Sequence, residues 1–552
     1  MKHFPRTHKR SLILTGIIVA VMISSTGVQP QSRRWITHNV SNLNPLYDRA
    51  VNVNSRMKGN LQPIPAHSFS SNKMDGALDA YSICFEETEI ESNTQHVKTY
   101  LDVVNSGDRE AIRNYITEHY DPSFLKKLPL DIHILFQMGI SYASAGLGYV
   151  LREPGPRRTE SMNALLYNNL TGSWINLTVP VTKEPPHKIN GFMNLEPAPL
   201  PSDVPPPEKR SDEAVVERLE ICMKKLVADD IFSGVVLLAR NGRPLFQKAY
   251  GFASRSYRVP NRLDTKFNIA SVGKIFTGVA VAQLAERGKL SFEDPLNAYV
   301  PSDWLKPEIS EKFQIRHLLT HTSGLGNYFQ KLYGQYKQLL FRNLDDYKML
   351  ISDETLAFEP GTKWAYSSTG MMLLGVVIEN VTGESYFDYV RSQIYKPAGM
   401  TNTDAFEKDL PVENRASAYA MDYSSKEPVL REVLFTRVMK GMPSGGSYST
   451  AEDLMKFDAA LRSHKLLGPE YTETVLTPKP EISAPTHGYG FFVTQTAAGR
   501  VASHGGDGSG VNCQFKMYLD SGYTVVVLSN YSPPAANIVE QVIEQMLLAM
   551  TY

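Results

Sequence analysis

The apolar residues of the N-terminal part of the chain change their period part-way along. Between residues 97 and 144 they recur at helical spacing, which predicts three successive helices. The segment 175–181 then alternates strictly between apolar and polar residues, the period of a strand with one buried face. Thr171-Gly172 before it favours a hairpin with the preceding segment, and 189–195 reads as one more strand. Helices followed by an antiparallel meander predict a small α+β domain over residues 76–195.

A second pattern begins at residue 211 and runs to residue 552. The apolar run 234–240 and the segment 244–250 flank Asn241-Gly242, the strongest short hairpin signal in the chain. Three more strands are predicted only near the C-terminus, at 501–504, 513–519 and 523–528. The sheet of this α/β domain therefore takes its strands from both ends of the domain. The residues in between read mainly as helix and loop.

One helix of that middle region is apolar on nearly all of its faces, which predicts that it is buried. Ser271 and Lys274 lie at its N-terminal end, three residues apart, so that their side chains share one face. A serine hydroxyl becomes a nucleophile when a base lies within hydrogen-bonding reach. A buried lysine supplies such a base because desolvation disfavours its charged form. The pair is therefore a candidate nucleophile and base, in the serine-x-x-lysine pattern of penicillin-recognising enzymes.

Three segments lie outside these domains. Residues 1–27 combine basic residues, a short apolar run and small residues, which predicts a signal peptide or, as the alternative, an uncleaved N-terminal membrane anchor. Residues 28–75 are rich in Asn, Ser and Pro without apolar periodicity and predict a flexible tether. Residues 196–210 carry six prolines and predict an extended linker between the domains. The protein is therefore expected to be exported, to the periplasm or the extracellular space.

Composition and charge exclude several classes of function. The 57 Lys and Arg residues balance 57 Asp and Glu residues, so nothing indicates a nucleic-acid partner. The 3 cysteines are far apart and predict isolated buried thiols, with one disulfide open to an exported chain. His317 and His321 are spaced like a zinc-binding pair, but no third ligand stands out and the sequence predicts neither a metal nor a cofactor. It carries no signal for an oligomeric state.

Six segments of the second domain, in this order, resemble the serine β-lactamase and penicillin-binding-protein superfamily, specifically its class C-like branch. They are 267–274, 290–295, 315–325, 360–368, 445–454 and 503–506. The resemblance implies a β-lactamase/transpeptidase-like fold over residues 211–552, with an antiparallel sheet flanked by helices and a mainly helical subdomain. The order of elements in residues 76–195 resembles the NTF2-like cone fold, which implies an accessory role for that domain.

The superfamily resemblance also implies roles for individual residues. Ser271 is the expected acylated nucleophile, Lys274 its base or proton relay, and Tyr366 the second relay; which of the last two is the base stays open. Asp507 is expected to donate its backbone N–H, together with that of Ser271, to the oxyanion of the tetrahedral intermediate. Gly506 is expected to let the substrate backbone approach closely.

Two positions depart from the pattern of the penicillin-hydrolysing members of this superfamily. His504 stands where those members have lysine, and a largely neutral imidazole is expected to hold a substrate carboxylate weakly. Ser368 stands where class C β-lactamases have asparagine, whose amide both donates and accepts hydrogen bonds. Both departures favour an esterase or peptidase-like role.

The sequence as a whole predicts an exported serine hydrolase that cleaves an ester or amide in a small molecule or peptide. One alternative is a D,D-peptidase or β-lactamase that acts on peptidoglycan-like or penicillin substrates. The other is a non-catalytic penicillin-binding sensor. Retention of Ser271, Lys274 and Tyr366 together argues against the sensor.

Overall fold

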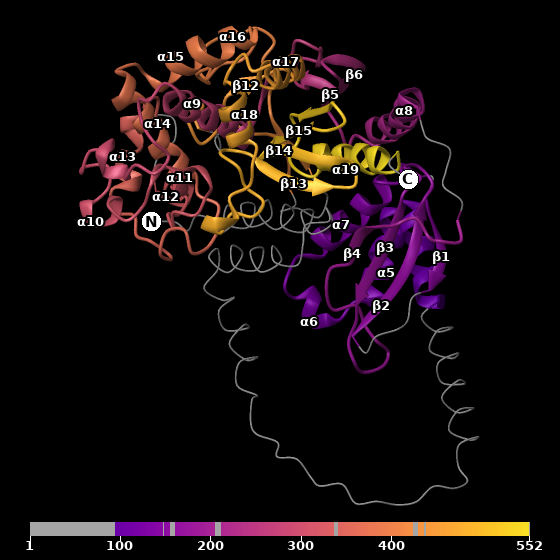
Figure 1. Ribbon diagram of the computed structural model, residues 1–552. Helices are drawn as coiled ribbons and strands as arrows, with labels where there is room; N and C mark the ends of the chain where they lie inside the picture. The colour runs from indigo at the N-terminus through magenta and orange to yellow at the C-terminus, as the bar shows by residue number, and fades with distance from the viewer. Residues whose placement is uncertain are drawn as a thin grey trace, which may run out of the picture. The chain divides into compact units, whose positions relative to one another are not determined.

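A computed structural model of the protein (Figure 1) describes residues 94–146, 148–154, 160–204, 211–335, 341–422, 429–434 and 438–550. These residues fall into two compact units, 94–204 and 211–550. The expected signal peptide or anchor at 1–27 and the expected tether at 28–75 lie outside the described residues. Inside the described ranges, no helix has both the length and the apolar character needed to cross a bilayer.

The unit 94–204 consists of helices followed by a four-stranded antiparallel sheet in the order β1-β2-β3-β4. Every second residue of β2 is buried, and Leu177 and Val179 of β3 are buried as the alternating pattern predicts. Gly172 adopts a left-handed φ of 66° in the turn between these two strands, as the expected hairpin requires. The elements are a helix at 94–106, α5 (Arg109–His119), α6 (Pro122–Leu125), α7 (Leu130–Tyr142), β1 (Tyr149–Pro154), β2 (Ser161–Asn168), β3 (Trp174–Pro180) and β4 (Asn194–Ala198).

Two features of this unit differ from the sequence-based expectation. The last strand is β4 at Asn194–Ala198, and Ile189 makes only isolated bridges, to Tyr120 and Val181. Strand β1 lies at the edge of the sheet and pairs with β2, and its residues show no apolar–polar alternation in the sequence. The unit is nevertheless of the expected α+β class.

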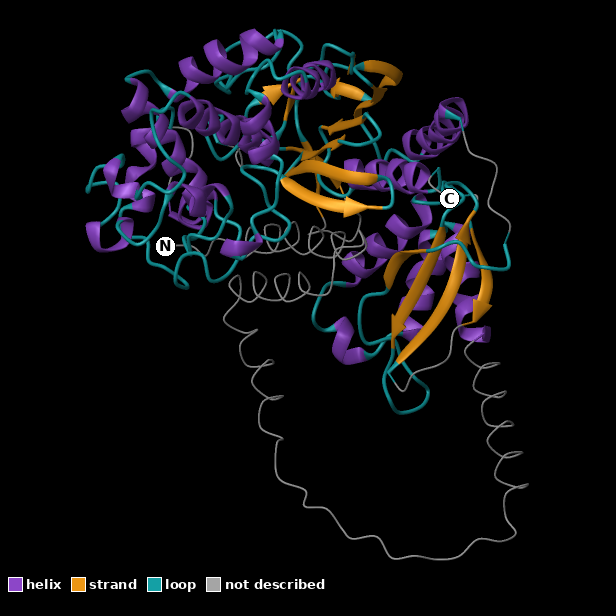
Figure 2. Ribbon diagram, in the orientation of Figure 1, coloured by secondary structure: helices purple, strands orange, loops and turns teal. Residues whose placement is uncertain are grey.

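The unit 211–550 contains a six-stranded antiparallel sheet in the order β13-β14-β15-β16-β5-β6. As predicted, its strands come from both ends of the unit. Figure 2 shows them gathered to one side of the unit, with most of the helices on the other. The strands are β5 (Gly234–Arg240), β6 (Arg243–Tyr250), β13 (Phe492–Thr496), β14 (Gly499–Gly508), β15 (Val511–Tyr518) and β16 (Tyr523–Ser529). Strand β13 is the one that the sequence pattern missed.

The hairpin between β5 and β6 turns at Asn241 and Gly242. Both residues have a positive φ, 51° and 74°, which is the conformation of a type I′ turn. Left-handed backbone is accessible to asparagine and glycine at little cost, so these two residues specify the turn. The predicted hairpin is confirmed.

Helices cover both faces of the sheet. On β15, Lys516 forms an ion pair with Glu540 of α19 (Ala535–Leu548), while its neighbour Phe515 contacts Phe457 of α17 (Ala451–Arg462) edge-on. Because successive strand residues point to opposite faces, α19 and α17 lie on opposite sides of the sheet. Helix α8 (Asp212–Ala228) packs beside α19.

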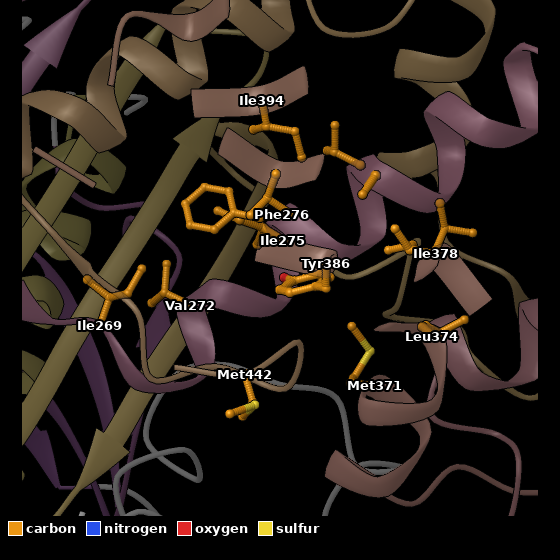
Figure 3. Packing of buried hydrophobic residues seen from close by; sticks show 14 of the residues in the cluster. Ile269, Val272, Ile275, Phe276, Met371, Leu374, Ile378, Tyr386, Ile394 and Met442 are labelled. Atoms are coloured by element: carbon orange, nitrogen blue, oxygen red, sulfur yellow. The ribbon is translucent and has the colours of Figure 1, made fainter. Parts of the chain in front are cut away.

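The helical part of this unit surrounds α9 (Lys274–Glu286), whose residues from Lys274 to Ala285 are all buried. Figure 3 shows Ile275 and Phe276 of α9 among Met371, Tyr386 and Ile394 from the helices around it. An all-round apolar helix of this kind is stable only inside a protein core, as its sequence predicts. Helices α14 (Ser368–Thr382), α15 (Tyr386–Val390) and α18 (Pro469–Val475) pack against α9. The other elements of this unit are α10 (Pro307–Ser310), α11 (Ile315–Leu319), α12 (Phe329–Gln335), α13 (Lys348–Ile351) and α16 (Lys396–Ala398), with short strands β7 (Phe252–Ser254), β8 (Val259–Pro260), β9 (Phe267–Asn268), β10 (Tyr419–Asp422), β11 (Val429–Glu432) and β12 (Tyr448–Ser449).

Candidate active site

Ser271 lies in a 3₁₀ turn, Ala270–Gly273, that leads directly into α9. The sequence predicted that Ser271 would lie in the first turn of the α-helix itself, whereas α9 begins at Lys274. Ala270 adopts a left-handed φ of 42°, a costly conformation for a residue with a Cβ. The Asn268 side chain supports this turn, because its Oδ1 accepts the Ala270 N–H at 3.0 Å. Strained backbone held in place by its surroundings is typical of functional sites. Here it sets the direction of the Ser271 side chain.

The Lys274 ammonium group is fully buried beside this serine. Its Nζ lies 3.1 Å from Ser271 Oγ and donates a second hydrogen bond to the carbonyl of Ser444. Burial lowers the pKa of Lys274 from 10.5 to about 7. A neutral amine donates to the Ser444 carbonyl and still offers its lone pair to the Ser271 hydroxyl. The site therefore holds a base poised near neutral pH within reach of the nucleophile.

The loop that carries Ser444 packs directly on the turn that carries the nucleophile. Gly446 donates its N–H to the Ala270 carbonyl at 2.9 Å. A Cβ at Gly445 would lie 2.3 Å from the same carbonyl oxygen, so only glycine fits there. The Gly445-Gly446 segment of the sequence motif therefore serves close packing around Ser271. The sequence gives no indication that the Ser444 carbonyl accepts a hydrogen bond from Lys274, because every residue has a backbone carbonyl.

Tyr366 lies on the other side of the Ser271–Lys274 pair. Its ring centroid is 4.8 Å from Lys274 Nζ, and its hydroxyl is hydrogen-bonded with Ser271. Burial raises the pKa of Tyr366 above its ordinary value of 10.0, the charge of Asp507 adds to the rise, and the Ser271 hydrogen bond opposes it. The phenol is therefore protonated at neutral pH.

His321 holds the backbone on both sides of Tyr366. Its carbonyl accepts the Ala365 N–H at 2.9 Å, and its Nδ1 accepts the Ser367 N–H at 3.2 Å. The imidazole is buried, and its centroid lies 4.5 Å from the Tyr366 ring. Burial, together with His487, lowers the pKa of His321 well below 6.5, so the ring stays neutral. His321, whose spacing from His317 resembles that of a zinc-binding pair, thus positions the tyrosine.

Asn327 completes the support of the tyrosine segment. Its Nδ2 donates to the Tyr366 carbonyl at 3.0 Å, and its Oδ1 accepts the Ser368 N–H at 2.8 Å. Ser368 is the first residue of α14 and only 2% exposed, so its hydroxyl has little surface to offer a substrate. Ser367 caps this helix instead, accepting the Gly370 N–H at 2.9 Å. Ser368 contacts the residues around Tyr366 through its backbone N–H, which Asn327 accepts.

Strand β14 forms a further wall of the site. Its partner β13 pairs only with residues 499–503, so within the described ranges residues 504–508 have no strand on that side. A Cβ at Gly506 would lie 2.2 Å from the Ile269 carbonyl oxygen, so this edge packs against the turn that carries Ser271. Gly506 is therefore required by the approach of the protein's own backbone. The expected approach of a substrate remains a prediction.

His504 is buried on β14, 6.4 Å from the Tyr366 ring and 5.4 Å from the Phe492 ring. Its Nδ1 lies 2.6 Å from the Gly505 carbonyl oxygen. Burial and the charge of Lys274 lower the pKa of His504 to about 3, against a smaller opposing effect of the Gly505 hydrogen bond. The imidazole is therefore neutral at physiological pH.

Asp507 follows on the same strand, and its Oδ1 accepts a hydrogen bond from Asn512 at 2.6 Å. Asn512 in turn accepts the N–H groups of Ala536 at 2.5 Å and Asn537 at 3.1 Å, at the start of α19. Burial raises the pKa of Asp507 to about 6, so the carboxylate is mostly charged above neutral pH. This chain of contacts joins the edge of the site to the helix behind the sheet.

The described residues contain no group of three His, Cys, Asp or Glu side chains arranged to hold a metal ion. His317 and His321, the pair with zinc-like spacing, each use Nδ1 to accept a backbone N–H, from Gln314 and Ser367 respectively. Cys222 and Cys513 are buried and form no disulfide, and the Cys513 thiol donates to the Asn268 carbonyl at 3.2 Å. The arrangement thus offers a hydroxyl nucleophile, an amine base and a phenol, which together suit acyl transfer.

A sequence model of the family described as Beta-lactamase matches residues 219–546. The chain belongs to the beta-lactamase family. It is 31% identical over 312 residues to Penicillin-binding protein 4* of Bacillus subtilis, covering 54% of this chain and 68% of that relative. It is 28% identical over 297 residues to Esterase EstB of Burkholderia gladioli, covering 47% of this chain and 74% of that relative.

The solved structures agree with this assignment. The crystal structure of a penicillin-binding protein from Bacillus halodurans matches with a TM-score of 0.52 and 31% identity, over 60% of this chain and 98% of that one. The expected fold class is confirmed, and the protein is a serine hydrolase of the beta-lactamase family. The family model begins at residue 219, so the NTF2-like resemblance of the N-terminal unit stays a prediction.

Proposed function

We propose that this protein cleaves an ester or amide bond through a covalent acyl-enzyme on Ser271, as an exported enzyme. The observation that carries the proposal is the buried Lys274 Nζ, 3.1 Å from Ser271 Oγ and with a pKa of about 7. A lysine with this lowered pKa holds a substantial neutral fraction at pH 7, whereas an exposed lysine is almost wholly charged. Export is supported by the signal-peptide pattern of residues 1–27.

The pKa directions favour a division of labour between the two proton-transfer groups. Lys274 takes the proton of Ser271 as the hydroxyl attacks the acyl carbon, because its pKa is lowered towards neutrality. Tyr366, whose pKa is raised, donates its proton to the leaving group and recovers one from Lys274. The backbone N–H groups of Ser271 and Asp507 are proposed to stabilise the oxyanion. Water then attacks the acyl-enzyme by the same route in reverse.

The substrate is proposed to be an ester or amide other than a penicillin. The name of Esterase EstB supports this choice, and so does His504, which places no fixed positive charge on β14 for a carboxylate. The rival D,D-peptidase or β-lactamase activity is supported by the name of Penicillin-binding protein 4*.

One set of reagents separates these possibilities. The purified protein and Ser271→Ala are treated with a fluorophosphonate probe, a short-chain nitrophenyl ester and a chromogenic cephalosporin. Ester turnover that is lost in Ser271→Ala is the expected result. Rapid cephalosporin turnover would favour a β-lactamase, and stable acylation by it without turnover would favour a sensor. No labelling by any reagent would refute the hydrolase assignment.

A further inference from the structure

The side-chain amide of Asn268 bridges two segments of the site. Its Oδ1 accepts the Ala270 N–H at 3.0 Å, and its Nδ2 donates to the Gly446 carbonyl at 2.7 Å. A backbone N–H only donates and a carbonyl only accepts, so these partners fix the orientation of the amide. Gly446 in turn donates its N–H to the Ala270 carbonyl at 2.9 Å. The amide therefore completes a ring of hydrogen bonds between the turn that carries Ser271 and the segment 443–446.

The segment 443–446 also holds the base. The Ser444 carbonyl accepts a hydrogen bond from Lys274 Nζ, and the Pro443 carbonyl accepts one from Thr277 at 2.7 Å, three residues further along α9. Any shift of the nucleophile turn relative to this segment therefore changes where the amine lies relative to the hydroxyl that it must deprotonate.

The backbone of Asn268 is held from the sheet behind it. Its carbonyl accepts the Cys513 thiol at 3.2 Å, and Asn268 pairs with Tyr448 in the short ladder of β9 and β12. Ala270, two residues later, has the left-handed backbone described above, which persists only where the surroundings hold it. The bridging amide thus has a fixed support, and the turn beyond it depends on that support.

We propose that Asn268 is a positioning residue that sets the geometry between Ser271 and its base, by tying the nucleophile turn to the backbone that holds Lys274. The inference rests on the proposed function, since it concerns the same acyl transfer. It goes beyond support of the turn, because it predicts that the bond to Gly446 controls how readily Lys274 is protonated. Without this bond the two segments separate, water reaches the buried amine, and its charged form is favoured.

Other titratable groups around Lys274 also shape the pH profile of the site. The charge of Lys274 acts on His321 and His504, whose imidazoles burial keeps neutral, and its Nζ lies over the ring of Tyr366, which burial keeps protonated. Asp507, whose charge acts on Tyr366, has a pKa raised by burial to about 6. We therefore assign the rise of activity around pH 7 to loss of the Lys274 proton, and any separate step near pH 6 to Asp507.

Two substitutions test the bridge. Asn268→Ala removes both of its side-chain hydrogen bonds. Asn268→Ser keeps a hydroxyl that accepts the Ala270 N–H, as serine does in a comparable turn, but the shorter side chain does not reach Gly446. Should Asn268→Ala not fold, Asn268→Ser alone decides.

Both variants should lose rate and not substrate binding. For nitrophenyl acetate at pH 7, kcat is expected to fall by about 10- to 100-fold while KM changes by less than about twofold, because the amide binds backbone and not substrate. The step assigned to Lys274 in the pH profile of kcat is expected to move up by about one pH unit, so that part of the lost activity returns at pH 9.

Asn530→Ala is the matched control. Asn530 is also a buried asparagine whose Nδ2 bridges two backbone carbonyls, those of Phe252 and Ser417, which take no part in the site. This variant should lower Tm but leave the pH profile unchanged. Circular dichroism and fluorophosphonate labelling of Ser271 report that each variant is folded.

Two results would overturn the inference while leaving the proposed function intact. One is a wild-type kcat and pH profile in Asn268→Ser, which would mean that the contact with Ala270 suffices. The other is a loss of activity in the Asn268 variants that is the same fraction at every pH, which would mean that the bridge does not act on Lys274. Absence of both labelling and ester turnover in the wild type would instead refute the proposed function.

Discussion

The burial of Lys274 leads to a prediction in which stability and activity move in opposite directions. Lys274→Met should remove the base and make the protein more stable near neutral pH. A shift of the lysine pKa from 10.5 to about 7 means that folding disfavours the charged form by about 5 kcal/mol at low pH. Methionine fills a similar volume and avoids this cost.

Part of the gain is offset, because the substitution leaves the Ser444 carbonyl and the Ser271 hydroxyl without their lysine partner. An unsatisfied buried polar group costs about 1–3 kcal/mol. The expected net stabilisation is therefore about 2 kcal/mol at pH 6.5. For a unit that spans residues 211–550, unfolding entropies imply a rise in Tm of about 3 °C.

The pH dependence gives the sharper test. Between about pH 7 and pH 10.5 the unfolded wild-type chain holds a proton on Lys274 that the folded chain has lost. The stability of the wild type therefore rises with pH in this window, relative to the methionine variant, by up to about 1.4 kcal/mol per pH unit. The advantage of Lys274→Met should be largest below pH 7, should vanish at about pH 8.5 and should reverse by about pH 10, where only the loss of the Ser444 and Ser271 contacts remains.

The assay is differential scanning calorimetry of both proteins from pH 6 to pH 10, alongside nitrophenyl ester hydrolysis. Turnover by Lys274→Met should fall by a factor of about 10²–10⁴ or more, the usual contribution of a general base. Lys289→Met, at an exposed lysine after α9, is the control and should show neither effect. A variant less stable than the wild type at pH 6.5, or a stability difference that does not narrow with pH, would refute the reasoning.

Three further substitutions test other parts of the site and fold. Tyr366→Phe should lower kcat for an amide by about 10²–10⁴-fold but that for a nitrophenyl ester much less, because nitrophenolate leaves without a proton. Gly506→Ala should displace the β14 edge from the Ser271 turn and lower ester kcat/KM by about a hundredfold, measured with circular dichroism unchanged. Lys516→Met should lower the free energy of unfolding by about 3–5 kcal/mol, measured in urea, because it leaves Glu540 and Glu544 buried together without their cation.

Each of these three predictions would be contradicted by a specific result. If Tyr366→Phe lowered kcat equally for the amide and the nitrophenyl ester, Tyr366 would not be the proton donor to the leaving group. Full activity of Gly506→Ala would mean that the edge of β14 moves freely. Lys516→Met combined with Glu540→Gln should recover part of the lost stability, and no recovery would show that the ion pair is not the cause.

The fold of the C-terminal unit was largely predictable because its signals are local. The type I′ turn at Asn241-Gly242 depends on two residues that tolerate a positive φ. The burial of α9 follows from its apolar residues alone. Strand β13 gave no such signal: it lies at a sheet edge, where only some of its residues are buried.

The sequence predicted the contacts of the candidate site only where both side chains belong to the same short motif. Ser271 and Lys274 come from one turn of chain, and their contact follows from the helical period. The acceptor at Ser444 lies 170 residues further on and acts through its carbonyl, which every residue possesses. His321 and Asn327 likewise support the Tyr366 segment through backbone groups. Contacts of this kind become visible only when the chain is folded.

The pairing of β16 with β5 has a consequence for how the protein is made. Ser529 donates a hydrogen bond to the Ser233 carbonyl, 296 residues earlier in the chain. The centre of the sheet therefore cannot close until β16 has been synthesised and has left the ribosome, and folding dominated by such distant contacts is slow. During synthesis, the β5–β6 hairpin therefore lacks its neighbouring strand β16, and its apolar face is not yet covered. For a chain expected to be exported, this delay keeps the hydrolase unit unfolded while its N-terminus is already available to a translocation apparatus.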